Sequence, residues 1–274
     1  MCSQTTEHKL LYSVKDCDIL RCRGCGLGRA EAQAFDPASY YTNDYFSGRR
    51  SDGYANYSGA EAVLRREFAR TVKFIRKRRN SGCLVELGCA YGYFLQEAAA
   101  HFKVFGIELA ADAAFHCRQS GLQVFIGTAD EATLQQIGSV DVFVLLDVIE
   151  HLPDPHETLR LLTRHLSPGG IIVITTGDFG SPFARLFGKH WRLMTPPQHL
   201  WFFNGDSVRR LASSLGLRLE HLDHPWKIVP LSLIVFQLRR MLGLRPRSRP
   251  GETDLGLPVN LFDAMRVVLR KPPS

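Results

Sequence analysis

Seven short segments along the chain have the length of β-strands, and some of them, such as residues 84–87, are continuous apolar runs. The seven segments lie at residues 84–87, 103–108, 122–127, 140–147, 169–176, 217–222 and 264–270. Unbroken apolar runs of this kind indicate strands that are buried on both faces, as in a parallel sheet covered by helices on each side. We therefore predict an α/β fold around a mostly parallel sheet of seven strands, with helices on both faces.

Two stretches outside these runs have helical spacing. Ser58 followed by Glu61 predicts a capping box, which starts a helix that runs to about Arg79. Apolar residues also recur at helical spacing between residues 231 and 242, just before the last predicted strand. We expect a helix there as well.

The turn after the first apolar run has the form of a ligand-binding loop. Residues 84–87 lead into Gly88, Ala90 and Gly92, and helical spacing resumes two residues later. Small residues let a backbone approach a ligand closely, and the free N–H groups of a helix N-terminus attract anionic oxygens. A dinucleotide loop, Gly-x-Gly-x-x-Gly, would instead need glycines where this chain has Ala90 and Tyr93. The alternative is a tight turn that binds nothing.

Four motifs, in order, resemble those of the class I S-adenosylmethionine (SAM) methyltransferases. They are the turn after the first run, the acid Glu108 that ends the second run, the segment after the fourth run, and the Ser-Pro-Gly-Gly turn at 167–170 that leads into the fifth. The turn Glu86-x-Gly-x-Ala-x-Gly92 resembles their motif I. The phrase Asp-x-x-Glu-His-x-x-Asp-Pro, from Asp147 to Pro155, is similar to the branch that includes the ubiquinone-biosynthesis O-methyltransferases. The resemblance implies a Rossmann-like sheet, SAM as cofactor, and methyl transfer to oxygen of a small-molecule, glycan or lipid-linked acceptor.

The resemblance also implies which residues contact SAM. Glu108 ends the second apolar run, at about the distance along the chain from Gly88 at which an acid reaches the ribose hydroxyls. Thr128 and Ala129 follow the third run and are expected beside the adenine. The full expected set is Glu86, Gly88, Cys89, Ala90, Gly92, Tyr93, Phe94, Glu108, Leu109, Thr128, Ala129 and Asp147.

Glu150, His151 and His199 are the candidate catalytic residues, because they follow the fourth and fifth apolar runs. Open α/β sheets bind their ligands at the carboxyl ends of their strands. Methyl transfer depends largely on positioning, but a hydroxyl acceptor also needs its proton removed or its pKa lowered by a metal. Three roles stay open: a histidine general base, a magnesium site that these residues form with Asp147, or structural and capping contacts.

The first fifty residues have a different character. Cys22-Arg-Gly-Cys25 is a turn that can direct two thiolates at one metal ion. The segment from Leu10 to Phe46 resembles the zinc-ribbon-like lead-in found before many bacterial methyltransferase domains. In that pattern an upstream Cys-x-x-Cys completes the site, and here only Cys2 could stand for it. The alternatives are a zinc ion bound by Cys2, Cys22 and Cys25, or a small hairpin without metal.

These observations divide the chain into two parts. Residues 1–57 form the cysteine-containing lead-in, whose aromatic residues are expected either to cover a pocket or to pack on the main domain. Residues 58–274 form the methyltransferase domain, with an amphipathic insertion at 227–255 that has no acidic residue before position 250. Its apolar and basic residues are typical of a helix on a membrane surface, so residues 230–243 are a candidate for peripheral membrane contact. A lid or a dimer helix is the alternative.

Composition and charge exclude few classes of binding partner. The net charge of +7 leaves nucleic acid, a membrane surface or a phosphorylated substrate open. A nucleic-acid methyltransferase is the less favoured alternative, because no base-flipping motif is evident and the basic residues do not alternate with stacking aromatics. A non-catalytic SAM-fold binding protein is a second one. Scattered cysteines and the lack of a signal-peptide pattern favour a cytoplasmic protein, and the amphipathic insertion makes the inner membrane face a candidate peripheral location.

Overall fold

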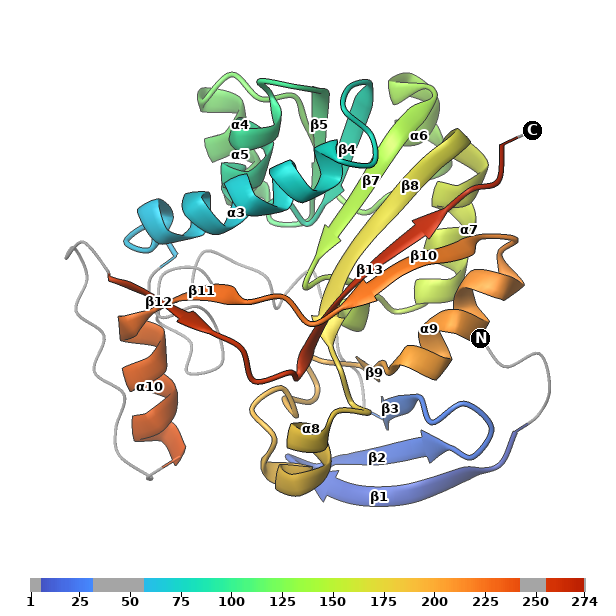
Figure 1. The fold of residues 1–274 in the computed structure, drawn as a ribbon, viewed down its shortest axis with the longest axis vertical. Coiled ribbons are helices and arrows are strands. Elements are labelled where there is room, and N and C mark those ends of the chain that lie inside the picture. Colours follow the sequence, from blue (N-terminus) through green and yellow to red (C-terminus); the bar gives the residue numbers. More distant parts are fainter. Residues whose placement is uncertain (1–5, 32–56, 242–254, 274) are drawn as a thin grey trace.

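A seven-stranded sheet forms the centre of the computed structural model, which describes residues 6–31, 57–241 and 255–273 (Figure 1). Its strands are β4 (Cys83–Leu87), β5 (Lys103–Glu108), β6 (Val124–Ile126), β7 (Val140–Leu146), β8 (Leu166–Gly177), β10 (Arg218–Asp223) and β13 (Ala264–Arg270). Their order is β10-β13-β8-β7-β4-β5-β6. The strands from β6 to β8 pair in parallel, and β13 runs antiparallel to both of its neighbours. The predicted seven-stranded, mostly parallel sheet is confirmed.

Helices cover both faces of this sheet, as predicted. The first face carries α3 (Glu61–Arg76), α4 (Tyr93–Ala98) and α5 (Ala111–Gln119), which bury Val72, Phe94 and Cys117 against the strands. The second face carries α6 (Glu131–Ile137), α7 (Pro155–His165) and α9 (Gly205–Ser214), which bury Leu134, Leu159 and Leu211. The strands are therefore apolar on both sides, which explains the unbroken runs in the sequence.

The predicted start of α3 is wrong. The helix begins at Glu61 with Ala60 as its N-cap, and no side chain caps it. Residues 57–60 form turns, and the Glu61 amide donates to the Ser58 carbonyl oxygen at 3.2 Å. The backbone of Ser58 thus satisfies the donor that its hydroxyl was expected to bind, and the helix ends at Arg76 rather than near Arg79.

The lead-in folds as an antiparallel sheet that includes a strand from the main domain. Its own strands are β1 (His8–Val14), β2 (Cys17–Cys22) and β3 (Gly28–Glu31), and β9 (Trp201–Phe202) pairs with β3 as the fourth strand. Cys2 and the aromatic residues between 40 and 56 lie outside the described residues.

The insertion before β13 forms a separate hairpin with a helix. Strands β11 (Lys227–Pro230) and β12 (Gly256–Val259) pair with each other, and α10 (Leu231–Met241) follows β11 directly, as expected from the helical spacing. Figure 1 shows this unit at one end of the molecule, beside α3. The Ile228 amide donates to Glu67 of α3 at 3.0 Å, which attaches the hairpin to the domain. Within the described ranges, no helix combines the length and apolar character needed to cross a bilayer.

A buried aspartate anchors the loop that follows β8, which contains α8 (Pro182–Phe187) and the short 3-10 turn η2 (Gly188–His190). The Asp263 carboxylate accepts one hydrogen bond from the Trp191 indole and two from the Arg192 guanidinium, all at 2.9 Å. Its side chain is only 2% exposed. This loop therefore has a fixed position at the carboxyl edge of the sheet.

Replacing this anchor should destabilise the protein strongly. We expect Asp263→Ala to lower the free energy of unfolding by about 3–5 kcal/mol, because it leaves a charged guanidinium and an indole without their shared partner. The control is Asp206→Ala, which removes an exposed ion pair with Arg209 and should cost less than about 1 kcal/mol. Urea unfolding followed by circular dichroism measures both, and equal losses would contradict the anchoring role.

Candidate functional site

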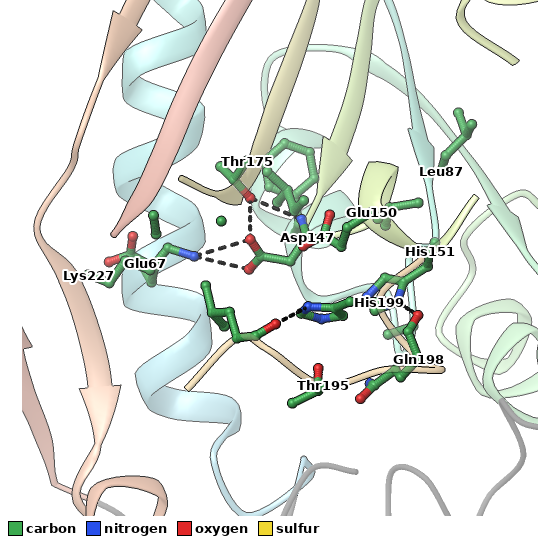
Figure 2. Close-up of a pocket in the computed structure, with 18 of the residues that line it drawn as sticks. Glu67, Leu87, Asp147, Glu150, His151, Thr175, Thr195, Gln198, His199 and Lys227 are labelled. Atoms are coloured by element: carbon green, nitrogen blue, oxygen red, sulfur yellow. Dashed lines mark hydrogen bonds and ion pairs between the residues drawn. The ribbon is translucent and has the colours of Figure 1, made fainter. Parts of the chain in front are cut away.

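One large cavity lies at the carboxyl ends of the parallel strands. Its volume is about 1060 Å³, and it is lined by the turn after β4, the ends of β5, β6 and β7, the loop after β8, and the insertion. Figure 2 shows the part around Asp147, Glu150 and the two histidines. The cavity thus brings together most of the chemistry that the sequence placed after different strands.

The turn after β4 passes very close to the segment after β7. Gly88 has φ +68°, and a Cβ atom there would lie 2.7 Å from Cγ2 of Val148, so only glycine fits. Just before it, the Glu86 side chain is 3% exposed, and its Oε2 atom has no hydrogen-bond partner among the described residues. Burial, together with nearby Cys117 and Glu108, raises the pKa of Glu86 well above its usual value. This cavity-lining carboxyl is therefore available to a ligand.

Glu108 ties the same turn to the end of β5. Its two carboxylate oxygens accept hydrogen bonds from the amides of Ala90 and Ala110, each at 2.8 Å. Burial raises the pKa of Glu108, although these amide hydrogen bonds oppose the shift. Each oxygen keeps a second lone pair that can accept from a ligand hydroxyl in the cavity.

All but two of the expected cofactor-binding residues line the cavity. The exceptions are Gly92 and Tyr93. Gly92 begins α4 with φ +77°, and a Cβ atom there would lie 2.5 Å from Leu122, so packing and backbone conformation account for this glycine. Tyr93 is buried and stacks on Tyr57, with ring centroids 5.5 Å apart.

Asp147 is held by a lysine that sequence reasoning did not include. The Lys227 ammonium, from β11, lies 3.0 Å and 3.3 Å from the two carboxylate oxygens, and the Thr175 hydroxyl donates at 2.9 Å (Figure 2). Burial raises the pKa of Asp147, but Lys227, the Thr175 hydroxyl and Arg192 together outweigh it, and the pKa is lowered. Lys227 and Asp147 are 80 residues apart, so no local pattern links them. The sequence showed Lys227 only as one of several basic residues in the insertion.

The two predicted histidines lie side by side although they are 48 positions apart. His151 and His199 have ring centroids 4.7 Å apart. The Nδ1 atom of His151 lies 2.8 Å from the Gln198 carbonyl oxygen, and that of His199 lies 2.8 Å from the Leu193 carbonyl oxygen. Because a carbonyl oxygen only accepts, each Nδ1 carries a proton, and Nε2 is the basic nitrogen of the neutral ring.

Burial makes these imidazoles hard to protonate. It lowers the pKa of His151, and for His199 burial and the neighbouring His151 lower the pKa to about 3. The charge of Asp147 acts in the opposite direction on both rings. The histidines are therefore neutral at ordinary pH and can accept a proton.

Glu150 completes a compact cluster with the two histidines. It is 4% exposed, and burial followed by the charge of Asp147 raises its pKa to about 8. Potential ligand atoms of Glu150, His151 and His199 all lie within 4.8 Å of one another, which is close enough for one metal ion. Asp147, the fourth expected magnesium ligand, is not part of this group.

The paired cysteines of the lead-in are buried in the main apolar core. Cys22 and Cys25 are 3% and 6% exposed, and they belong to the same cluster as Val208 and Leu211 of α9. The Cys22 thiol donates to the Thr6 hydroxyl at 3.3 Å. Among the residues that the structure describes, no group of three potential metal ligands includes a cysteine.

Comparison with known proteins agrees with this architecture. A family model described as a methyltransferase domain matches residues 60–222. The ubiquinone biosynthesis O-methyltransferase of Caulobacter vibrioides is 35% identical over 165 residues, which cover 52% of this chain and 65% of that protein. Three such relatives are matched over 42%, 55% and 65% of their lengths, so the chain spans about half the length of the curated relatives it matches.

Solved structures share the fold at low sequence identity. Magnesium protoporphyrin IX methyltransferase from Synechocystis PCC 6803 has a TM-score of 0.52 and 13% identity, over 85% of this chain and 99% of that one. A putative methyltransferase from Bacillus halodurans C-125 has a TM-score of 0.52 and 14% identity, over 74% of this chain and 98% of that one. Because the family model spans more than half of the sequence, the chain belongs to the methyltransferase domain family.

Proposed function

We propose that the protein transfers a methyl group from SAM to an oxygen atom of a small-molecule acceptor. The observation that carries the proposal is that one cavity is lined both by an acidic turn with a closely packed glycine and by a neutral pair of imidazoles. Relatives named ubiquinone biosynthesis O-methyltransferases support a small acceptor and transfer to oxygen. No comparison favours nucleic acid as the acceptor.

The donor end fits SAM in charge and shape. SAM supplies an electrophilic methyl group on a positively charged sulfur, and Glu86, Glu108 and Asp147 are among the carboxyl groups that line the cavity. Glu86 offers an oxygen without a partner among the described residues, and Glu108 offers its remaining lone pairs to ribose hydroxyls. Thr128 and Ala129 line the cavity beyond β6, where we assign the adenine.

At the acceptor end, we assign His199 as the proton acceptor, with His151 as the alternative. The Leu193 carbonyl fixes the tautomer that leaves Nε2 of His199 basic, and the low pKa keeps the ring neutral. The negative charge of Asp147 favours the imidazolium that forms when the acceptor hydroxyl loses its proton. Positioning the acceptor beside this base is the main contribution of the chain to the rate.

A divalent cation is a second candidate for acceptor activation. Glu150, His151 and His199 can reach one ion, which would lower the pKa of a hydroxyl bound to it. Each ring bonds a backbone carbonyl through Nδ1, as metal-ligating histidines commonly do. A set of two imidazoles and one carboxylate suits a transition metal better than the magnesium expected from the sequence.

We also propose that the acceptor end opens onto a membrane surface. Leu233, Ile234 and Leu238 of α10 line the cavity. Leu231, Val235 and Leu238 are 37–53% exposed and recur at helical spacing. The same unit exposes further large apolar side chains on its strands and flanks, namely Trp226, Leu255, Leu257, Leu261 and Phe262. An apolar surface that continues into a cavity suits an acceptor with an apolar part.

Binding of SAM tests the donor site directly. We expect micromolar or tighter binding by wild type in calorimetry, and an affinity at least about tenfold lower in Gly88→Ala, because the new Cβ meets Val148. Gly138→Ala is the matched control, since Gly138 has a similar φ of +88° but no atom within 4 Å of the added Cβ. Absence of binding by wild type would refute the proposed function.

Removal of the base should affect chemistry rather than binding. We expect His199→Ala to lower kcat about 10²- to 10⁴-fold with unchanged SAM affinity, measured as S-adenosylhomocysteine formation in a screen of sugars, quinols and lipids. The control is His101→Ala, outside the cavity. Full turnover in both His199→Ala and His151→Ala would remove these residues from the reaction, and inactivation of wild type by a chelator would favour the metal.

The pH dependence distinguishes a perturbed histidine from an ordinary one. Because the pKa of His199 is lowered to about 3, the ring stays neutral as the pH falls from 7 to 5.5, a range in which Glu150, with a pKa of about 8, stays mostly protonated. The kcat of wild type should therefore remain nearly constant over this range. A histidine of ordinary pKa, near 6.5, would lose about tenfold of its basic form by pH 5.5, so a fall of that size would contradict the assignment.

Membrane contact is tested by liposome flotation. We expect wild type to float with vesicles of phosphatidylcholine and phosphatidylglycerol and Val235→Asp to remain largely unbound, because a charge is placed on the exposed apolar side of α10. Phe115→Asp is the control, since Phe115 is 60% exposed on α5, away from the insertion. Equal flotation of both variants would argue against α10 as the contact.

A further inference from the structure

The lead-in sheet includes the strand that directly follows the proposed base. Strand β3 pairs with β9 at Gly28–Phe202 and Arg29–Trp201, and the Ala30 amide donates to the Leu200 carbonyl oxygen at 2.9 Å. Leu200 is the neighbour of His199 in sequence. A segment at the start of the chain therefore hydrogen-bonds to the backbone one residue from the acceptor end of the cavity.

The other side of this segment is bonded to the residues that carry His151. The Leu200 amide donates to the Glu150 carbonyl oxygen at 2.9 Å, and the Trp201 indole donates to the Leu152 carbonyl oxygen at 2.8 Å. The carbonyl and the amide of Leu200 thus both have backbone partners, Ala30 of the lead-in and Glu150 of the segment after β7. Together they set the direction in which the adjacent His199 side chain leaves the backbone.

Close packing at Gly28 and Cys25 holds the lead-in against this strand. A Cβ atom on Gly28 would lie 2.8 Å from Cβ of Phe202 and 3.0 Å from the ring of Phe179, so β3 approaches as closely as glycine permits. The buried Asn204 side chain, which caps α9, also donates to the Cys25 carbonyl oxygen at 3.2 Å. The register between lead-in and domain is therefore well defined.

We propose that the lead-in sheet positions the proton acceptor, with the N–H group of Ala30 as the positioning group for His199. The inference rests on the proposed function, in which His199 takes the acceptor proton. A displacement of a reacting group by about 1 Å can lower a rate by about 10². A single backbone hydrogen bond from outside the catalytic domain can therefore control turnover without any contact to SAM.

The test compares two substitutions at one position. Ala30→Pro removes the donor that binds Leu200, whereas Ala30→Gly retains it. We expect kcat of Ala30→Pro to be at least about tenfold below that of Ala30→Gly, with SAM affinities within about twofold of each other. Hydrogen exchange should accelerate at the Leu200 amide in Ala30→Pro, because loosening this segment also weakens its bond to the Glu150 carbonyl oxygen, and should stay unchanged at Val85 in β4.

Gly28→Ala provides a second variant, because its Cβ pushes β9 away without removing a donor. It should also lower kcat while keeping SAM affinity, and it decides the question if Ala30→Pro does not fold. Equal kcat values for both Ala30 variants would overturn the inference. A loss of SAM binding in parallel with kcat would also overturn it, because the sheet would then stabilise the protein in general rather than position His199. Failure of the proposed function differs from both, because wild type itself would then show no turnover.

Discussion

The close approach of the turn after β4 to the segment after β7 is the constraint on which the site depends. Gly88 occupies a left-handed conformation against Val148, and no side chain fits between them. This contact brings Glu86 and Glu108 into the same cavity as Glu150 and His151. These side chains share one space because two loops from neighbouring parallel strands meet at the same edge of the sheet.

An ion pair and a raised carboxyl pKa limit the negative charge in this cavity. Several carboxyl groups line this one cavity. Among the cationic side chains described there, Lys227 is the one that binds Asp147 directly. Burial and the negative charge of Asp147 raise the pKa of Glu150 to about 8, so that Glu150 is protonated below that pH. Asp147 itself stays ionised beside the lysine. The ionised Asp147 favours a cationic ligand, and its charge partly offsets the effect of burial, which lowers the pKa of both imidazoles.

Two additions at the periphery surround the central sheet. The lead-in supplies β3 to the strand that follows His199, and the insertion supplies Lys227 together with the apolar wall formed by α10. Lys227 and α10 line the cavity themselves, whereas β3 is connected to it through the strand that follows His199.

The sequence by itself determined the sheet, its helices and the donor turn, because continuous apolar runs and small residues encode local structure directly. It also indicated Glu150, His151 and His199 one by one, from their places after strands. It failed at the cap of α3, where the Ser58 backbone does what a side chain was expected to do. Only the tertiary structure decided that the two histidines adjoin, that Lys227 binds Asp147 across 80 residues, and that β3 pairs with β9. Contacts between distant segments depend on how the sheet edges and loops pack in space, and no local pattern of residues records that packing.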